Sequence, residues 1–168
     1  MVKIVITGPE SSGKTTLAQA LSRHYAAPWV PEYSRDYLNK LGHEYQEEDL
    51  LKIAQEQVKR EDAAAQKQPR LLICDTSLIV IKVWSEYVYG RCHPWILQQI
   101  ALRPIDLHLL CSPDIPWEPD PLRENPSDRD DLFQRYQQAL QNQPTVVVRG
   151  DREERMAQAR NAINPLFS

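Results

Sequence analysis

The sequence predicts an α/β fold, with a mainly parallel, five-stranded sheet between two layers of helices. Three observations support this prediction. Short apolar segments alternate along the chain with longer segments of helical periodicity, as in strand–helix–strand units. Several of the apolar segments are continuous, which is typical of parallel strands that are buried on both faces. The length of 168 residues suits one domain with a sizeable core, so we expect residues 1–168 to form a single domain.

The chain begins with an expected strand and a loop that contains two glycines. Residues 1–7 are apolar except for Lys3 and are rich in β-branched side chains, so we expect a buried strand. From Gly8 to Thr15 the loop reads Gly-Pro-Glu-Ser-Ser-Gly-Lys-Thr, which fits the phosphate-loop pattern G-x-x-x-x-G-K-[ST] at every fixed position. A chance glycine-rich turn is the alternative. The strand before the loop and the helical spacing after it favour a phosphate loop.

The residue types in this loop suit a nucleoside triphosphate. Gly8 and Gly13 let the backbone turn tightly, so that successive N–H groups converge on one anion, and the following helix N-terminus adds partial positive charge. Lys14 would reach the β- and γ-phosphates, and the Thr15 hydroxyl would bind Mg²⁺. The sequence therefore predicts the three-layer fold of P-loop NTPases, with a nucleoside triphosphate and Mg²⁺ bound at this loop. The predicted triphosphate-binding residues are Gly8, Pro9, Glu10, Ser11, Ser12, Gly13, Lys14, Thr15, Thr16 and, later in the chain, Arg129.

The remaining elements follow from periodicity and from helix start and stop signals. We expect the first helix to end near residue 24 or 25. The further expected strands are residues 27–32, 70–75, 105–111 and 145–149. The further expected helices are residues 33–41, 46–67, 77–89, 93–102, 131–142 and 152–163. We expect Lys59, Arg60, Glu61 and Asp62 to form the solvated face of the helix at 46–67. Residues 112–130 remain as a long connection.

Composition excludes several classes of partner. The formal net charge is −3 and there is no long basic block, so a nucleic-acid partner has no electrostatic support. The apolar runs are too short to cross a bilayer and no secretory signal is visible, so we expect a cytoplasmic protein without a membrane partner. Cys74, Cys92 and Cys111 are widely spaced and imply neither a disulfide framework nor a metal site, and we expect Cys74 and Cys111 to be buried. The sequence predicts no particular oligomeric state.

Two carboxylates follow expected strands. Asp75 ends an apolar strand, where it could hold Mg²⁺ together with Thr15, although it could instead cap the helix at 77–89. Glu32 ends the second strand and could accept a proton from an acceptor hydroxyl, hold a ribose diol, or simply begin the next helix. Arg35 lies near Glu32 in sequence and could pair with it or contact a phosphate. Which carboxylate is the proton acceptor stays open.

Residues 112–130 are too long and too polar for a passive connection, and they contain five prolines. We expect a lid that excludes water from the reaction. Arg123 and Arg129 are spaced to reach transferring phosphates from this lid, and their alternative role is to neutralise nearby carboxylates. The predicted catalytic residues are therefore Lys14, Glu32, Asp75 and Arg123.

Aromatic side chains gather at the end of the helix expected at 77–89. Trp84 and Tyr87 lie on the same side of this helix and could stack a flat ring of a substrate. Aromatic residues at helical spacing also commonly belong to the core, and this alternative stays open.

These motifs together resemble the NadR-type ribosylnicotinamide kinase domains, P-loop kinases of NAD biosynthesis, in their free-standing form. The resemblance covers essentially the whole chain. The matching stretches begin at Gly8 (GPESSGKTT), Pro31 (PEYSRDY), Cys74 (CDT), Trp84 (WSEYVYG) and Asp114 (DIPWEPDPLR).

The resemblance implies ATP-dependent phosphorylation of the ribose 5′-hydroxyl of nicotinamide riboside. It implies that Glu32, Tyr33 and Arg35 lie at the nucleoside site and that Arg123 is the lid arginine. The predicted substrate-binding residues are Glu32, Tyr33, Arg35, Asp75, Trp84 and Tyr87. Two alternatives remain, namely a P-loop kinase for another nucleoside or small metabolite, and a regulatory NTPase whose nucleotide state controls a protein partner.

Overall fold

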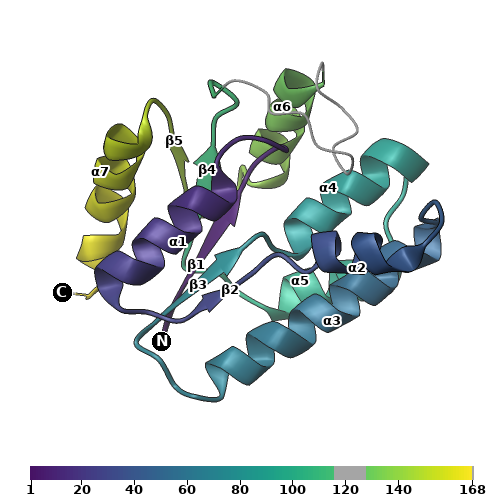
Figure 1. The fold of residues 1–168 in the computed structure, drawn as a ribbon, viewed down its shortest axis with the longest axis horizontal. Helices are drawn as coiled ribbons and strands as arrows, with labels where there is room; N and C mark the ends of the chain where they lie inside the picture. The colour runs from purple at the N-terminus through teal and green to yellow at the C-terminus, as the bar shows by residue number, and fades with distance from the viewer. Residues whose placement is uncertain (116–127, 168) are drawn as a thin grey trace.

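The computed structural model describes residues 1–115 and 128–167. In this part of the chain, five parallel strands form one sheet (Figure 1). The strands are β1 (Val2–Thr7), β2 (Trp29–Val30), β3 (Leu71–Asp75), β4 (Leu107–Cys111) and β5 (Thr145–Val148). Their order across the sheet is β2-β3-β1-β4-β5, so the first strand of the chain lies at the centre.

Helices cover both faces of the sheet, as predicted. One face carries α1 (Lys14–Tyr25) and α7 (Arg152–Ile163). The other carries α3 (Glu47–Ala65), α4 (Leu78–Tyr89), α5 (Pro94–Leu102) and α6 (Arg129–Ala139). A short helix, α2 (Ser34–Leu41), packs beside α3 and α4 (Figure 1). The result is the predicted three-layer α/β sandwich.

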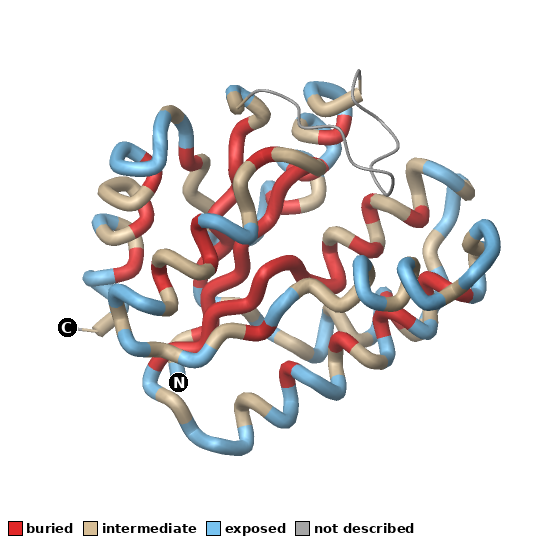
Figure 2. The backbone as a smooth tube through the Cα atoms, viewed as in Figure 1, coloured by how far each residue is buried: buried red, intermediate tan, exposed pale blue. Residues whose placement is uncertain are grey.

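The strands alternate their side chains between the two helical layers. Ile4 and Ile6 of β1 pack with α1 and α7, whereas Val5 between them packs with the opposite layer. Figure 2 shows the central strands buried along their length and the outer helices buried only on their inner sides. This burial on both faces explains why the strands are continuous apolar runs in the sequence.

Lys3 interrupts the apolar run of β1 because it forms a buried ion pair. Its Nζ donates to Glu61 Oε2 of α3 at 3.1 Å, and Arg103 contacts the same oxygen at 3.4 Å. The sequence pattern suggested that Glu61 belongs to a solvated helix face, and this is wrong, since the residue is only 3% exposed. The partner of Glu61 comes from a strand 58 residues away, which no local pattern reveals.

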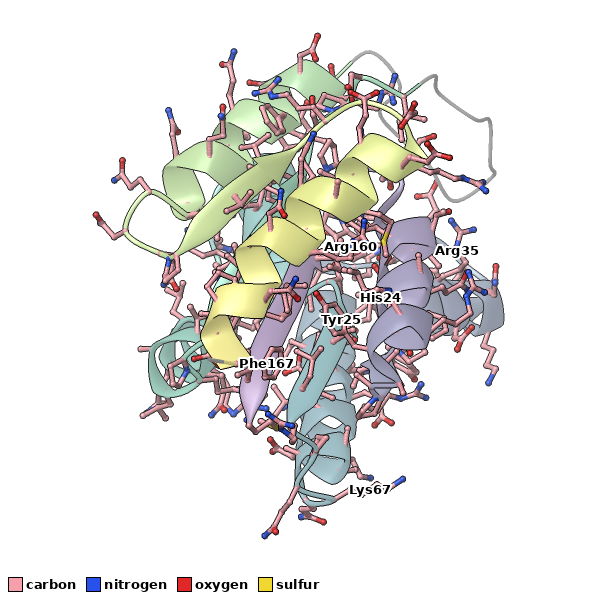
Figure 3. All side chains as sticks on the ribbon, turned by 90° about the vertical axis from the view of Figure 1, so that its left-hand side faces the viewer. His24, Tyr25, Arg35, Lys67, Arg160 and Phe167 are labelled. Atoms are coloured by element: carbon pink, nitrogen blue, oxygen red, sulfur yellow. The ribbon has the colours of Figure 1, made fainter. Side chains whose placement is uncertain are left out.

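The C-terminal turn η1 (Asn164–Phe167) is attached to α1. Tyr25 donates its hydroxyl hydrogen to Asn164 Oδ1 at 2.6 Å, and its ring lies 6.3 Å from that of Phe167 (Figure 3). These contacts join α1 to the end of the chain on the same face of the sheet.

The second strand is shorter than the predicted 27–32. Only Trp29 and Val30 pair with β3, because prolines flank them at 28 and 31 and proline lacks the N–H that a ladder requires. β2 is an edge strand, where this is tolerated. Glu32 therefore lies two residues beyond the strand end rather than on it.

The helix predicted at 131–142 begins earlier, at Arg129. Arg129 is thus in the first turn of α6, and the lid predicted at 112–130 has only its two ends within the described residues. Arg123 lies outside the described residues.

Cys74 and Cys111 are buried, as predicted, and both are free thiols. In the described residues, no helix has the length and apolarity needed to cross a membrane.

The N-terminus of α4 is capped by Ser77 and not by Asp75. Ser77 Oγ accepts a hydrogen bond from the Ile79 N–H at 3.1 Å in extended backbone geometry. We expect Ser77→Ala to lower the free energy of unfolding by about 1 kcal/mol, because the N–H of Ile79 loses its partner. Urea denaturation measures this loss. Ser77→Thr keeps the hydroxyl and should lie closer to the wild type, and an equal loss in both variants would contradict the capping role.

Candidate functional site

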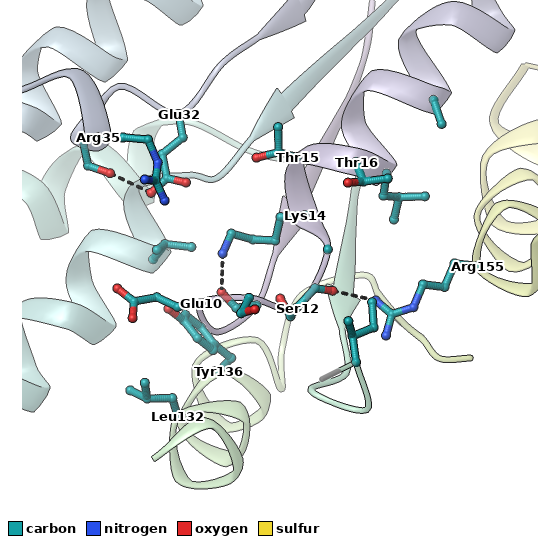
Figure 4. Close-up of a pocket in the computed structure, with 18 of the residues that line it drawn as sticks. Glu10, Ser12, Lys14, Thr15, Thr16, Glu32, Arg35, Leu132, Tyr136 and Arg155 are labelled. Carbon is teal, nitrogen blue, oxygen red and sulfur yellow. Dashed lines mark hydrogen bonds between the residues drawn. The ribbon is translucent and has the colours of Figure 1, made fainter. Parts of the chain in front are cut away.

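A cavity of about 430 Å³ opens beside the phosphate loop (Figure 4). One end lies between α1 and α7, where Arg23, Arg152 and Met156 contribute to its wall. The other end lies between α2, α4 and α6, where Arg35, Trp84 and Leu132 contribute. The loop between β1 and α1 separates these two ends, so one continuous cavity passes across the predicted phosphate site.

The phosphate loop is tightly packed, and this explains its glycines. Gly8 has φ +150°, and a Cβ there would lie 2.9 Å from the carbonyl oxygen of Cys111. Gly13 has φ +85° and is the N-cap of α1, with no side chain capping the helix. The first N–H groups of α1 are therefore left without a side-chain acceptor next to the cavity, and such groups favour an anion.

The Lys14 side chain extends across the loop. Its Nζ donates to the carbonyl oxygens of Gly8 at 3.0 Å and Pro9 at 3.2 Å (Figure 4). Ser12 Oγ donates to the same Pro9 oxygen at 2.6 Å. The ammonium group thus lies at the mouth of the loop, where it can neutralise a bound phosphate.

Thr15 and Asp75 form the oxygen pair that the sequence suggested. Thr15 Oγ1 donates to Asp75 Oδ2 at 2.6 Å. Asp75 is 1% exposed and its Oδ1 has no hydrogen-bond partner among the described groups. Hydroxyl and carboxylate oxygens are the ligands that Mg²⁺ prefers, usually with waters and phosphate oxygens completing the shell. This pair, with one oxygen unused, suits that role.

Burial raises the pKa of Asp75 to about 6, and the nearby charge of Glu32 contributes to the rise. Lys14 and the Thr15 hydrogen bond act in the opposite direction. The ionised carboxylate is therefore held at a cost, which a bound cation would offset.

The backbone next to Asp75 is strained. Thr76 has φ +83°, an unusual value for a β-branched residue, and it is 3% exposed. Its N–H donates to the carbonyl oxygen of Ile6 at 2.9 Å, which ties it to β1. Such strain persists only where surrounding contacts impose it, and it is often found at functional sites.

Glu32 lines the end of the cavity that lies between α2, α4 and α6. Ser34 Oγ donates to Glu32 Oε1 at 2.6 Å, which orients the carboxylate. Figure 4 shows Glu32 and Arg35 together, on the other side of Lys14 from Arg155. Asp75, in contrast, is buried below Thr15 and is not among the described cavity-lining residues.

The three predicted aromatic residues differ in their placement. Trp84 and Tyr87 both contribute to the cavity wall. They also make internal contacts, since Trp84 Nε1 donates to Tyr45 Oη at 3.1 Å and the Tyr87 hydroxyl donates to Asp128 at 2.7 Å. Tyr33 is not among the described lining residues but packs with the helices, below the guanidinium of Arg60 at 4.3 Å.

The sequence interpretation missed several cavity-lining residues, among them Leu132, Tyr136 and Arg155. Leu132 and Tyr136 of α6 line the wall, and Arg155 of α7 lies beside the phosphate loop (Figure 4). Arg155 is 3% exposed. It lies on the buried face of α7 with Ala159 and Ile163, at a spacing of four residues, so helical periodicity could have indicated its burial but not its contact with the loop.

Arg129, predicted as a phosphate-binding residue, also contacts the loop. Its Nη1 donates to the carbonyl oxygen of Ser11 at 3.2 Å and to that of Ile115 at 2.6 Å. These contacts are with backbone atoms, and a direct contact with phosphate stays a prediction. The same holds for Arg123.

Comparison with known proteins identifies relatives of this chain. A family model described as an AAA domain matches residues 3–155. The trifunctional NAD biosynthesis/regulator protein NadR of Escherichia coli (strain K12) is 29% identical over 157 residues, which are 90% of this chain and 38% of the relative. NadR of Salmonella typhimurium (strain LT2) is 32% identical over 124 residues, which are 71% of this chain and 30% of the relative. The chain thus spans well under half the length of these relatives.

Solved structures share the fold. NadR protein in complex with NR matches with a TM-score of 0.79 and 21% identity, covering 98% of this chain and 51% of that one. Deoxyadenosine kinase from M. mycoides with bound dATP matches with a TM-score of 0.62 and 15% identity, covering 98% of this chain and all of that one. At these identities the comparison establishes the fold.

The raised pKa of Asp75 predicts how stability depends on pH. Burial raises the pKa of Asp75 from its usual 3.8 to about 6 in the folded protein, so folding disfavours the ionised carboxylate. Without Mg²⁺ at pH 8, Asp75→Asn should raise the free energy of unfolding by about 1–3 kcal/mol. This advantage should shrink as the pH falls through 6 and be lost near pH 4, because the wild-type carboxyl is then protonated. Urea denaturation at several pH values checks this, and a pH-independent difference would contradict it.

Proposed function

The chain belongs to the AAA domain family, and because 90% of it is similar to NadR, we propose that it is an ATP-dependent kinase. It would phosphorylate the ribose 5′-hydroxyl of nicotinamide riboside, giving nicotinamide mononucleotide. One observation carries the proposal. A single cavity joins the phosphate loop to a second compartment lined by Glu32, Arg35 and Trp84. A kinase needs such a compartment for its acceptor, next to the transferring phosphate.

The phosphate loop would hold the triphosphate of ATP. Backbone N–H groups at the start of α1 and the Lys14 ammonium would neutralise charge on the transferring group, most strongly in the transition state. Thr15 and Asp75 would hold Mg²⁺, which would supply positive charge to neutralise the triphosphate when bound.

Glu32 would act as the proton acceptor of the 5′-hydroxyl. Its carboxylate lines the cavity and is oriented by Ser34, whereas Asp75 is buried and engaged with Thr15. This difference in placement favours Glu32 as the base and Asp75 as the metal-holding residue, an assignment that the sequence left open. Trp84 and Tyr87 would then contact the ring of the nucleoside.

We include in the proposal the cytoplasmic location that the sequence predicted. We also propose that residues 1–168 act as a single kinase domain.

A related candidate is a kinase for another nucleoside. The fold is shared with a deoxyadenosine kinase as well as with NadR, and Trp84 and Tyr87 would suit several flat rings. A regulatory NTPase is the remaining alternative, and it has no need of the acceptor compartment.

The test is Mg²⁺-dependent ADP release from ATP, with nicotinamide riboside and with a panel of other nucleosides. Strong stimulation by nicotinamide riboside, with the mononucleotide as product, is expected. Lys14→Ala should lower the stimulated rate by at least about a hundredfold, since the lost charge acts in the transition state. Lys40→Ala, on the exposed side of α2, is the control and should keep full activity. Stimulation by a different nucleoside alone would reassign the substrate, and slow ADP release that no acceptor changes would favour the regulatory NTPase.

Glu32→Gln should separate chemistry from nucleotide binding. The amide cannot take up the hydroxyl proton, so kcat should fall by about 10²–10⁴-fold while the Kd for ATP changes little. Steady-state kinetics and equilibrium ATP binding measure the two quantities. Glu44→Gln, at an exposed position, is the matched control. A collapse of ATP affinity would place Glu32 at the nucleotide site instead.

A further inference from the structure

Arg155 is a buried arginine that joins separate segments around the phosphate loop. Its Nη1 donates to the carbonyl oxygen of Ser12 at 2.7 Å, and its Nη2 donates to that of Ser112 at 2.9 Å. Its Nε donates to the carbonyl oxygen of Gly150 at 2.9 Å, and Nη2 also contacts the Asp114 carboxylate. One side chain from α7 thus holds backbone of the loop, of the segment after β4 and of the turn after β5.

The contact with Ser12 controls the direction of a peptide group in the loop. A trans peptide is planar, and its C=O and N–H point in opposite directions. Figure 4 shows Arg155 and Lys14 on opposite sides of Ser12. Because the Ser12 oxygen points to Arg155, the N–H of the same peptide, which belongs to Gly13, points toward the Lys14 side, where the phosphate site lies.

Arg129 makes the corresponding contact one peptide earlier. It donates to the carbonyl oxygen of Ser11, whose peptide carries the N–H of Ser12. Ser11 has φ +58°, a left-handed conformation that is costly for a residue with a side chain. Two arginines from helices late in the chain therefore hold the outer carbonyl groups of successive loop peptides, one of them in a strained conformation.

The positive charge of Arg155 is neutralised by a carboxylate of the protein. The Asp114 carboxylate contacts its guanidinium, and Asp114 Oδ2 accepts a further hydrogen bond from the Gly150 N–H at 2.7 Å. These contacts hold the guanidinium in place within the protein. This arrangement is suited to positioning the loop in advance of a ligand.

We propose that Arg155, assisted by Arg129, is a positioning residue that keeps the Gly13 and Ser12 N–H groups directed at a bound polyphosphate. It acts through the loop backbone, so its effect should appear in the binding of the anion itself, without an acceptor. The inference deepens the proposed function and rests on its nucleotide site. It does not depend on which acceptor is phosphorylated.

The test compares Arg155→Met with the wild type for binding of tripolyphosphate and of ATP, each without acceptor. Methionine fills much of the volume but donates no hydrogen bonds, so the Kd for both ligands should rise at least about tenfold, or about 1.4 kcal/mol. Arg155→Lys retains a donor and the charge and should fall between the two. Arg160→Met, on the same helix (Figure 3), is the control and should bind as the wild type does.

Further measurements separate a positioning role from a purely structural one. Amide hydrogen exchange at Gly13 should become faster in Arg155→Lys and Arg155→Met, and the KM of the acceptor should stay near the wild-type value while kcat falls.

A folded Arg155→Met variant with lower thermal stability but unchanged tripolyphosphate affinity would overturn the inference. If that variant does not fold, Arg155→Lys decides, because unchanged affinity together with unchanged exchange at Gly13 would overturn it as well. If the wild type binds ATP but phosphorylates no acceptor, the proposed function fails, and the comparison of tripolyphosphate affinities still tests Arg155.

Discussion

The parallel register of β1 between β3 and β4 is the constraint on which the site depends. Ile6 lies level with Asp75 on one side, and Thr7 lies level with Leu110 on the other. The strand ends therefore meet at one edge of the sheet, where the loop after β1 turns back against Cys111. Because β1 is central and fully covered, the loop has a rigid base, and Asp75 comes within 2.6 Å of Thr15 without any local sequence relation between them.

Polar groups that are buried at this edge are costly for the fold and useful for the site. Burial raises the pKa of Asp75, which makes its ionised form costly, and Thr76 next to it has a strained backbone. Arg155 is buried but satisfies its donors on carbonyl oxygens and on Asp114. Lys3 of β1 and Glu61 of α3 form an ion pair that joins the sheet to a helix and lies away from the site. Asp75 thus differs from the structural ion pair in that its hydrogen-bond partner is the neutral Thr15 hydroxyl and not a cation.

Local patterns were enough for much of the fold. The phosphate loop, the strand before it and the helix after it follow from spacing that a short window contains, and the continuous apolar runs indicated a covered parallel sheet. The errors have different causes. Glu61 is buried by a partner distant in sequence, whereas β2 is shortened by the prolines that flank Trp29 and Val30.

By itself the sequence determined the fold class, the phosphate loop and the residue types of an oxygen pair for a cation, because each depends on neighbours within a few positions. Only the tertiary structure decided which carboxylate lines the cavity, since Glu32 and Asp75 look alike in sequence but differ in burial. It also decided that Arg155 reaches the loop, 143 residues from Ser12 along the chain. Such contacts depend on how helices and strands pack across the whole sheet, and periodicity within one element carries no information about them.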